Sequence, residues 1–242
     1  MKTKENSILI TGGATGIGFA LAKAFIDEGN EVTICGRRVD KLKEAKSKIP
    51  QLHTIKCDIS KAEERECLNN SIDVNILINN AGILRMIDIK KGLSSLIGES
   101  EIETNLVAPI QLSATFIPSL LRYKESAIIN VTSGLAFVPM AAAPIYCATK
   151  AAMHSFSLSL RHQLRNTTLK VFEVMPPIVD TELHKDARNG LKDRSISPSE
   201  VAKVTLEALQ RDEYEIVIGM AQDLRTGSRN SPEQTFQGIN KA

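Results

Sequence analysis

Short apolar segments alternate with longer helical patterns along most of the chain. The strand-like segments are Ser7–Thr11, Glu31–Cys35, His53–Lys56, Val74–Asn79, Ala127–Thr132, Leu169–Met175 and Tyr214–Ile218. The helix-like segments are Gly16–Glu28, Val39–Lys48, Lys61–Asn70, Glu99–Arg122, Pro144–Arg165 and Pro198–Gln210. Strands that alternate with helices form right-handed crossovers and a parallel sheet with helices on both faces. The sequence therefore predicts an α/β fold, a single Rossmann-like domain with a doubly wound parallel sheet of about seven strands.

The length of 242 residues is ordinary for one such domain, and no change in composition divides the chain. We expect the domain to span residues 1–220. The polar stretch at about 179–197 is expected to form a lid over the substrate. From residue 221 to 242 the chain is polar and weakly periodic, and we expect a C-terminal tail.

Composition excludes several classes of function. Basic residues number 30 and acidic residues 28, without a block of like charge, so we expect no nucleic-acid partner. No signal-peptide pattern and no apolar run of about 20 residues are present, so we expect no membrane span and a cytoplasmic location. The four cysteines form no C-x-x-C pair and the four histidines no H-E-x-x-H pattern. We therefore expect reduced thiols and no metal site.

The first strand-like segment leads directly into a glycine-rich turn, "TGGATGIG" at residues 11–18, and then into a helical pattern. Gly12 allows a tight turn, Gly16 lets the backbone approach a phosphate, and Gly18 lets helix and sheet pack closely. The N–H groups at the helix start then hold a pyrophosphate. The spacing differs from the usual G-x-G-x-x-G, and a plain strand-to-helix turn is the alternative. No lysine follows the glycines, which excludes a nucleoside-triphosphate P-loop.

The end of the second strand indicates which dinucleotide is bound. A carboxylate there normally holds the ribose 2′-hydroxyl of NAD, whereas arginine accommodates the 2′-phosphate of NADP. Here the strand ends in "VTICGRR", so Arg37 and Arg38 take the place of the acid. A solvated pair of arginines that opens the next helix is the alternative. We predict NADP(H) as the cofactor, because the planar guanidinium group suits a phosphate.

With these motifs in place, the sequence resembles the short-chain dehydrogenase/reductase (SDR) family from about Ser7 to Ile218. The resemblance rests on an ordered set of motifs, each modest alone: "TGGATGIG" (11–18), "CDI" (57–59), "NNAG" (79–82), Asn105, "VTSG" (131–134) and "YCATK" (146–150). The stretch "MPPIVDTEL" (175–183) resembles the DltE-like branch of this family. The resemblance implies hydride transfer between a nicotinamide and a small-molecule carbonyl or alcohol.

Tyr146 and Lys150 stand four residues apart, on one face of a helix. The ordinary pKa of tyrosine, about 10, is too high for a base at neutral pH. We expect the charge of Lys150, helped by that of the nicotinamide, to lower the pKa of Tyr146 so that it acts as general acid and base. Ser133 is expected to hydrogen-bond the substrate oxygen. The resemblance gives Asn105 a water-mediated link to Lys150. Alone, a Y-x-x-x-K pair is more typical of a helix surface.

The resemblance also implies the cofactor contacts. The expected cofactor-binding residues are Gly12, Thr15, Gly16, Ile17, Gly18, Arg37, Arg38, Asp58, Ile59, Asn80, Ala81, Gly82, Tyr146, Lys150, Pro176, Ile178 and Thr181. The family usually has Pro-Gly after the sixth strand, whereas Pro177 follows Pro176 here. That change removes flexibility and one N–H group beside the nicotinamide.

Two other functions are alternatives to the oxidoreductase. A non-catalytic, redox-sensing NADP(H)-binding regulator usually lacks Tyr146 or Lys150, and both are present. A serine hydrolase would need a G-x-S-x-G elbow, which "VTSGL" lacks. The small residues Ala148, Ala151, Ala152 and Ser155 suggest close contact between helices. We therefore expect a homodimer or homotetramer.

Overall fold

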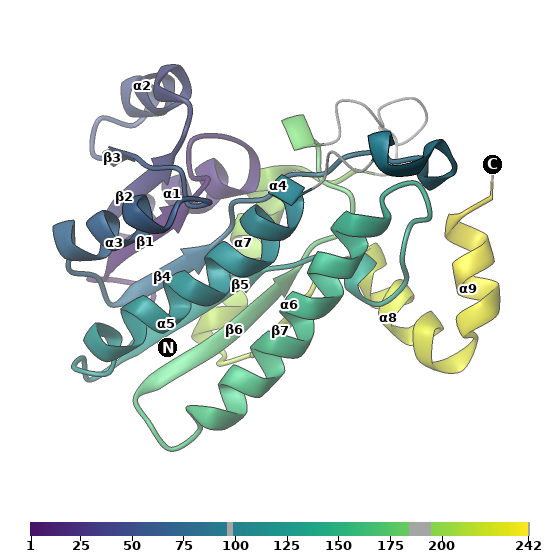
Figure 1. Cartoon of the computed structure of the whole chain (residues 1–242). Helices are drawn as coiled ribbons and strands as arrows, with labels where there is room; N and C mark the ends of the chain where they lie inside the picture. Colours follow the sequence, from purple (N-terminus) through teal and green to yellow (C-terminus); the bar gives the residue numbers. More distant parts are fainter. Residues whose placement is uncertain (96–98, 184–194, 242) are drawn as a thin grey trace.

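The chain folds around one seven-stranded parallel sheet with the strand order β3-β2-β1-β4-β5-β6-β7 (Figure 1). A computed structural model describes residues 1–95, 99–183 and 195–241. The strands are β1 (Ser7–Thr11), β2 (Glu31–Gly36), β3 (His53–Lys56), β4 (Ile76–Asn79), β5 (Ser126–Val131), β6 (Leu169–Met175) and β7 (Glu215–Val217). The predicted α/β fold with a single doubly wound sheet is confirmed.

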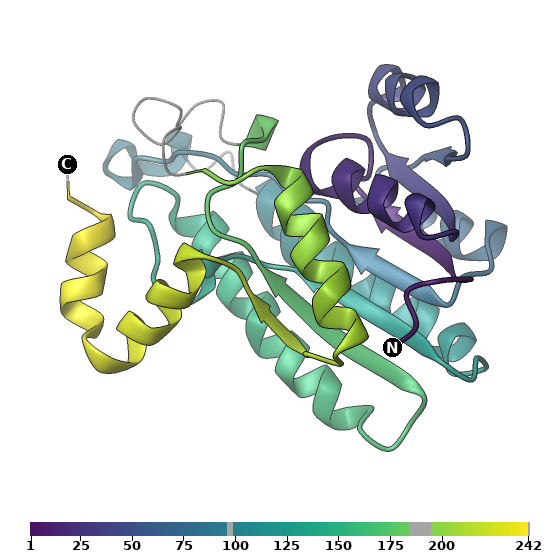
Figure 2. The same cartoon turned by 180° about the vertical axis from the view of Figure 1, so that it is seen from behind.

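Helices cover both faces of the sheet, as the opposite views of Figures 1 and 2 show. The helices are α1 (Gly16–Asp27), α2 (Val39–Lys48), α3 (Ala62–Ser71), α4 (Glu99–Ile102), α5 (Ala108–Leu120), α6 (Pro144–Gln163), α7 (Pro198–Gln210), α8 (Met220–Asn230) and α9 (Pro232–Ile239). Short 3₁₀ segments are η1 (Ile89–Ser95) and η3 (Gly134–Ala136), and η2 (Glu103–Val107) is a π-helical turn. No described helix combines the length and hydrophobicity that a membrane span requires.

Successive side chains of β1 point to opposite faces of the sheet and so belong to two separate parts of the hydrophobic core. Ile8, Leu9 and Ile10 are all fully buried. Ile8 and Ile10 belong to the core under α1, α2 and α7, whereas Leu9 belongs to the core under α3, α5 and α6. An apolar run without polar interruption is what a strand buried on both faces requires. Strand β1 is therefore buried on both faces of the sheet.

The strand order reverses between β1 and β4, because the chain builds outward to β3 and then returns to the other side of β1. Ligands of open α/β sheets bind at such a switch point, beyond the carboxyl ends of the strands. The glycine-rich turn follows β1, and Asn80 follows β4, at this edge. The fold therefore collects the predicted motifs at one end of the sheet.

Three segments differ from the sequence-based expectations or lie outside the described residues. The helix expected over Glu99–Arg122 is divided into α4, the π turn η2 and α5. The residues from Ala221 onward, expected as a tail, are helical in α8 and α9. Of the expected lid, residues 184–194 lie outside the described residues. Its two ends are joined, because Asp180 N donates to Ile196 O at 3.0 Å.

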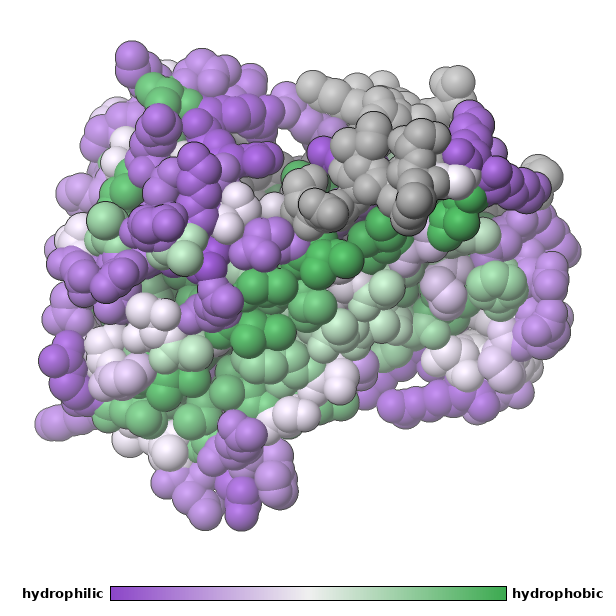
Figure 3. Space-filling model, viewed as in Figure 1, coloured by the Kyte–Doolittle hydropathy of each residue, from purple (hydrophilic) through white to green (hydrophobic). Residues whose placement is uncertain are grey.

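An apolar band crosses the molecular surface over α5 and α6, with polar residues along its borders (Figure 3). Leu121, at the end of α5, and Leu158, on α6, are each 40% exposed. The small residues Ala148, Ala151 and Ser155 are also exposed on α6. This surface is the one for which the sequence predicts contact between subunits.

Candidate active site

The glycine-rich turn packs directly on the segment that follows β4. Gly12 and Gly16 have φ angles of 64° and 56°, which favour glycine. A Cβ atom on Gly18 would lie 2.5 Å from both Asn80 Nδ2 and Gly12 O. Thr11 Oγ1 accepts hydrogen bonds from Asn80 N and Ala81 N, each at 3.0 Å. The turn and the Asn80–Gly82 segment therefore form one rigid unit.

The start of α1 presents uncapped N–H groups beside this turn. Thr15 is the N-cap residue, and in the described part of the chain no side chain bonds to the first turn of α1. The first N–H groups of a helix lack intrahelical partners and attract anions. Gly16, Ile17 and Gly18 supply these groups. These residues fit the pyrophosphate of a dinucleotide.

Both predicted 2′-phosphate ligands follow β2 and are paired with carboxylates, and Arg38 also contacts this turn. Arg38 Nη1 is 2.8 Å from Glu182 Oε2, and its Nη2 donates to Thr15 Oγ1 at 3.2 Å. Arg37 Nη1 is 4.0 Å from Asp58 Oδ2. Arg37 and Arg38 are both about half exposed. The ends of β2 and β3 therefore meet the glycine-rich turn at a basic, accessible edge.

The other expected cofactor residues lie along the same edge of the sheet. Thr181 packs on the turn, because a Cβ atom on Gly16 would lie 3.0 Å from Thr181 Cγ2. Pro176 O accepts a hydrogen bond from Gly134 N at 3.0 Å, and Ile178 O accepts one from Ile196 N at 3.1 Å. Ile59 is buried beside Asp58. The structure thus places these residues together, with Pro176 and Ile178 engaged through their backbones.

Tyr146 and Lys150 lie on the buried face of α6, 4% and 5% exposed. Lys150 Nζ is 5.5 Å from the centroid of the Tyr146 ring. It donates a hydrogen bond to Val131 O at 2.9 Å, which ties α6 to the end of β5. Burial lowers the pKa of Lys150 to about 8, and the negative charge of Glu173 opposes that change. The ammonium group is therefore close to its titration point at physiological pH.

Ser133 follows β5 and faces the same tyrosine. Its Oγ accepts a hydrogen bond from Leu135 N at 3.1 Å, at the start of η3. Burial raises the pKa of Tyr146, and a hydrogen bond with Ser133 lowers it to a smaller extent. The result is opposite to the expected lowering of the Tyr146 pKa by Lys150. Without a further positive charge, Tyr146 is a neutral phenol that can donate a proton.

Asn105 lies in the π turn η2 and bonds to the loop after β4. Its Oδ1 accepts from Ile83 N at 2.9 Å, and its Nδ2 donates to Ile83 O at 2.8 Å. A Cβ atom on Gly82 would lie 3.5 Å from Asn105 Oδ1 and 3.8 Å from Lys150 Nζ. Asn105 and Lys150 therefore border the same glycine, where a Cβ atom would make ordinary van der Waals contact with both.

Two buried carboxylates near these groups were not predicted. Glu101 is fully buried, its Oε1 accepts from Arg85 N at 3.2 Å, and Oε2 has no partner among the described residues. Its electrostatic interaction contributes to the raised pKa of Tyr146. Glu173 is fully buried in β6. Glu101 stands four residues before Asn105, and Glu173 interrupts an apolar strand, so each carried a signal in the sequence.

Comparison with known proteins agrees with this geometry. A family model described as short chain dehydrogenase matches residues 6–192. The chain is 46% identical to the uncharacterized oxidoreductase DltE of Bacillus subtilis, over 99% of this chain and 98% of that protein. It is 29% identical to the NADP-dependent 3-hydroxy acid dehydrogenase YdfG of Salmonella typhi, over 71% of this chain and 72% of that protein.

Solved structures give the same picture. A short chain dehydrogenase from Burkholderia cenocepacia in complex with NADP superposes with a TM-score of 0.87, at 25% identity and complete coverage of both chains. A short chain dehydrogenase/reductase from Burkholderia phymatum in complex with NAD has a TM-score of 0.85 at 19% identity, covering 100% of this chain and 98% of that one. At that identity, the second likeness concerns the fold alone.

Proposed function

Because the chain belongs to the short-chain dehydrogenase family, whose members include oxidoreductases, we propose that it reduces a small carbonyl compound with NADPH, or oxidises the corresponding alcohol. The observation that carries this proposal is the convergence of Ser133, Tyr146 and Lys150 at the carboxyl end of β5, beside a helix start that fits a pyrophosphate. The regulator alternative is not favoured, since a full set of proton-transfer groups is present.

The choice of NADP(H) rests on charge. The described ends of β2 and β3 present Arg37 and Arg38, each beside a carboxylate: Asp58 is 4.0 Å from Arg37, and Glu182 is 2.8 Å from Arg38. A guanidinium group forms charge-assisted hydrogen bonds to a phosphate. The names of two similar proteins, one NADP-dependent and one complexed with NADP, support the same choice.

In the proposed reaction, NADPH, when bound, supplies the hydride that reduces the carbonyl carbon. The Tyr146 hydroxyl, which stays protonated because burial raises its pKa, donates its proton to the carbonyl oxygen. Ser133 Oγ donates a hydrogen bond to the same oxygen as negative charge develops on it. Lys150 then stabilises the tyrosine after proton loss, because its ammonium lies 5.5 Å from the ring.

The substrate pocket is expected beside this group of residues. Leu84, Arg85 and Met86 follow the β4 motif, and Leu135, Ala136 and Phe137 lie at η3. Tyr146 packs with Leu84 and Leu135 in a small apolar cluster. We infer a substrate with an apolar portion next to its carbonyl group. We also propose that the enzyme is a cytoplasmic homodimer or homotetramer, in which the subunits contact one another through the apolar band of α5 and α6.

A panel of ketones, aldehydes and keto acids, monitored by NADPH oxidation, tests the proposal. Tyr146→Phe should lower turnover at least 10²-fold, because it removes the transferable proton, while the dissociation constant for NADPH stays close to wild type. Tyr214→Phe is the matched control, since Tyr214 lies on the far side of β6, stacked on Phe172 at 5.1 Å. Retention of more than about a tenth of the turnover in Tyr146→Phe would refute the mechanism.

A further inference from the structure

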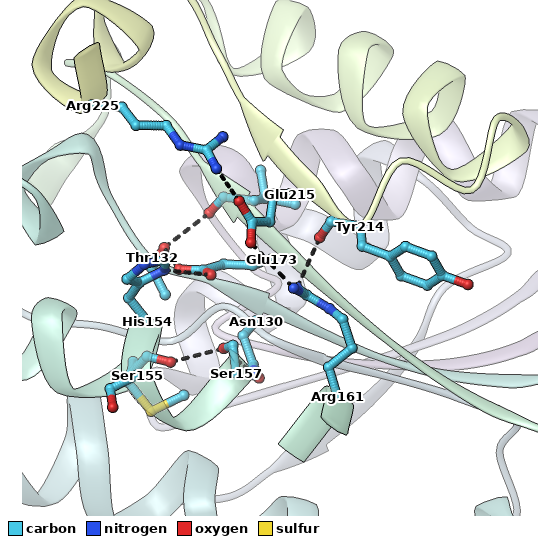
Figure 4. Close-up of polar contacts among 12 residues, drawn as sticks. Asn130, Thr132, His154, Ser155, Ser157, Arg161, Glu173, Tyr214, Glu215 and Arg225 are labelled. Carbon is cyan, nitrogen blue, oxygen red and sulfur yellow. Dashed lines mark hydrogen bonds and ion pairs between the residues drawn. The ribbon is translucent and has the colours of Figure 1, made fainter. Parts of the chain in front are cut away.

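A fully buried carboxylate, Glu173, lies in β6 behind the catalytic helix, and both of its oxygens are engaged (Figure 4). Thr132 Oγ1 donates to Glu173 Oε1 at 2.6 Å. His154 Nδ1 is 2.8 Å from Glu173 Oε2. Thr132 follows β5, whereas His154 lies on α6. One side chain therefore bridges a strand end and a helix, and a buried carboxylate is stable there because it is fully hydrogen-bonded.

Both partners of Glu173 are adjacent to catalytic groups. Thr132 stands between Val131, whose oxygen accepts from Lys150 Nζ at 2.9 Å, and Ser133. His154 lies one helical turn beyond Lys150 on α6. A closed ring of contacts thus runs from Lys150 through the end of β5 to Glu173, and returns through His154 to α6.

We propose that Glu173 and His154 are positioning residues of the catalytic site, which hold the strand end that carries Ser133 at a defined distance from the helix that carries Tyr146 and Lys150. The proposal rests on the proposed function for its catalytic meaning. The contacts of Glu173 and His154, and their charges, are properties of this chain whether or not that function is correct.

The charge of Glu173 also reaches Lys150. Burial lowers the pKa of Lys150 to about 8, and the Glu173 carboxylate is the charged group that opposes this change. The groups that face His154 are Glu173 on β6, Glu215 on β7 and Arg225 on α8, with Phe137 in edge contact at 5.1 Å. Glu215 is itself paired with Arg161, at 3.3 Å, and with Arg225. Glu173 is therefore the carboxylate of this cluster that acts on Lys150.

Substitutions of the two residues should move the pKa of Lys150 in opposite directions. Glu173→Gln removes the negative charge, so the pKa of Lys150 should fall by about 1 unit, the lower end of the effect of a nearby charge. His154→Gln removes the partial positive charge that offsets Glu173, because hydrogen bonding to Glu173 raises the pKa of His154. The pKa of Lys150 should then rise by a smaller amount. A purely structural role gives no reason for opposite signs.

The first experiment measures the pKa of Lys150 by NMR titration of the whole protein labelled with ¹³C at lysine Cε. The Lys150 signal is assigned by its loss in Lys150→Arg. Glu215→Gln is the matched control, since it removes the same charge from the register neighbour of Glu173 on β7. An unchanged Lys150 pKa in Glu173→Gln, or an equal shift in Glu215→Gln, overturns the proposal. An unchanged or lowered pKa in His154→Gln overturns the role of His154.

The second experiment tests position with any carbonyl compound that the enzyme reduces. Thr132→Val breaks the bond to Glu173 and should lower kcat about 10-fold or more, since small displacements of reacting groups reduce rates strongly. Thr132→Ser keeps the hydroxyl and should restore kcat, and the KM for NADPH should change little in either variant. Equal kcat values for the Thr132→Val and Thr132→Ser variants contradict the proposal. If wild type reduces no carbonyl compound, the proposed function fails, while the NMR titration still decides the inference.

Discussion

At the scale of single residues, Arg38 illustrates how an accessible cation can serve two partners. It is bonded to Glu182 and Thr15, and a 2′-phosphate at this edge would compete with the Glu182 carboxylate for the guanidinium group. We predict that Glu182→Gln binds NADPH more tightly than wild type, with little change for NADH. Dissociation constants from fluorescence titration check this. Weaker NADPH binding would instead make Glu182 a supporting contact.

A second prediction concerns the two arginines themselves, Arg37 and Arg38. We expect Arg37→Ala combined with Arg38→Ala to erase most of the preference for NADPH over NADH, by roughly 1–3 kcal/mol on the scale of hydrogen bonds to charged groups. Arg211→Ala is the control, because Arg211 is exposed and pairs with Glu213 at 3.0 Å, beyond the end of α7. Equal affinities of the wild type for NADPH and NADH would exclude Arg37 and Arg38 as ligands of a 2′-phosphate.

Gly18 and Gly36 form a matched pair for the glycine-rich turn. A Cβ atom on Gly18 would meet Asn80 Nδ2 and Gly12 O at 2.5 Å, whereas none of the described atoms lies within 4 Å of a Cβ atom on Gly36. Gly18→Ala should therefore lower the free energy of unfolding by about 1–3 kcal/mol, as overpacking does, and weaken cofactor binding. Gly36→Ala should leave stability nearly unchanged. Urea unfolding curves and NADPH titrations distinguish the two.

The pair of His154 and Glu173 predicts a pH dependence of stability. Hydrogen bonding to Glu173 raises the pKa of His154 above its unfolded value of about 6.5. The resulting stabilisation is complete below about pH 6.5 and is lost as the pH rises through the folded-state pKa. In urea unfolding across this range, Glu173→Gln should show a flatter dependence than wild type. His162→Gln, on an exposed position of α6, should retain the wild-type slope.

At the scale of elements, α8 reaches the active site through η3. A Cβ atom on Gly134 would lie 2.8 Å from Ala221 Cβ and 3.0 Å from Ala221 Cα. We predict that Gly134→Ala displaces α8 or η3, lowers stability by about 1–3 kcal/mol and reduces turnover, because η3 begins beside Ser133. Gly238→Ala on α9 meets none of the described atoms within 4 Å and should cost nothing. Undiminished turnover in Gly134→Ala would show that the packing of α8 on η3 does not influence the active site.

Most elements could be predicted from the sequence because their signals are local. All seven expected strands are present with bounds that differ by two residues at most, since buried parallel strands read as apolar runs. The π turn η2 was missed, because a helical pattern does not indicate where one extra residue is inserted. The helices α8 and α9 were missed because their polar sequence gains helical structure from packing on η3 and on each other.

The candidate site was foreseen to the extent that its chemistry is carried by ordered motifs. Tyr146, Lys150 and Ser133 could be named because they fall in an ordered set of motifs that resembles a known family, whereas the Y-x-x-x-K spacing alone would not have sufficed. Glu101 and Glu173 could not be given a role, since their meaning depends on partners from other elements, such as Arg85 and Thr132. Burial, which raises the pKa of Tyr146, is a tertiary property that the motif spacing does not indicate.

At the scale of the whole molecule, the apolar band over α5 and α6 bears on assembly (Figure 3). If subunits pair there, Ala151→Arg places a charge in the contact, and sedimentation should show particles of monomer mass, 26.5 kDa. Ser47→Arg, on an exposed position of α2, is the control and should sediment as wild type does. A wild type that already sediments as a monomer at micromolar concentration would contradict the predicted homodimer or homotetramer.

The order of the strands has a consequence for the chain as it is synthesised. A ribosome completes β1, β2 and β3 by Lys56, but the partner for the other edge of β1 arrives only with β4, which begins at Ile76. In that interval the nascent half-sheet presents unpaired backbone groups next to Ile8, Leu9 and Ile10, all fully buried in the finished protein. Such an edge pairs readily with other chains. Strand β1, an interior strand of the mature sheet, is thus the exposed flank of the growing one, and the nascent chain is most open to mispairing there.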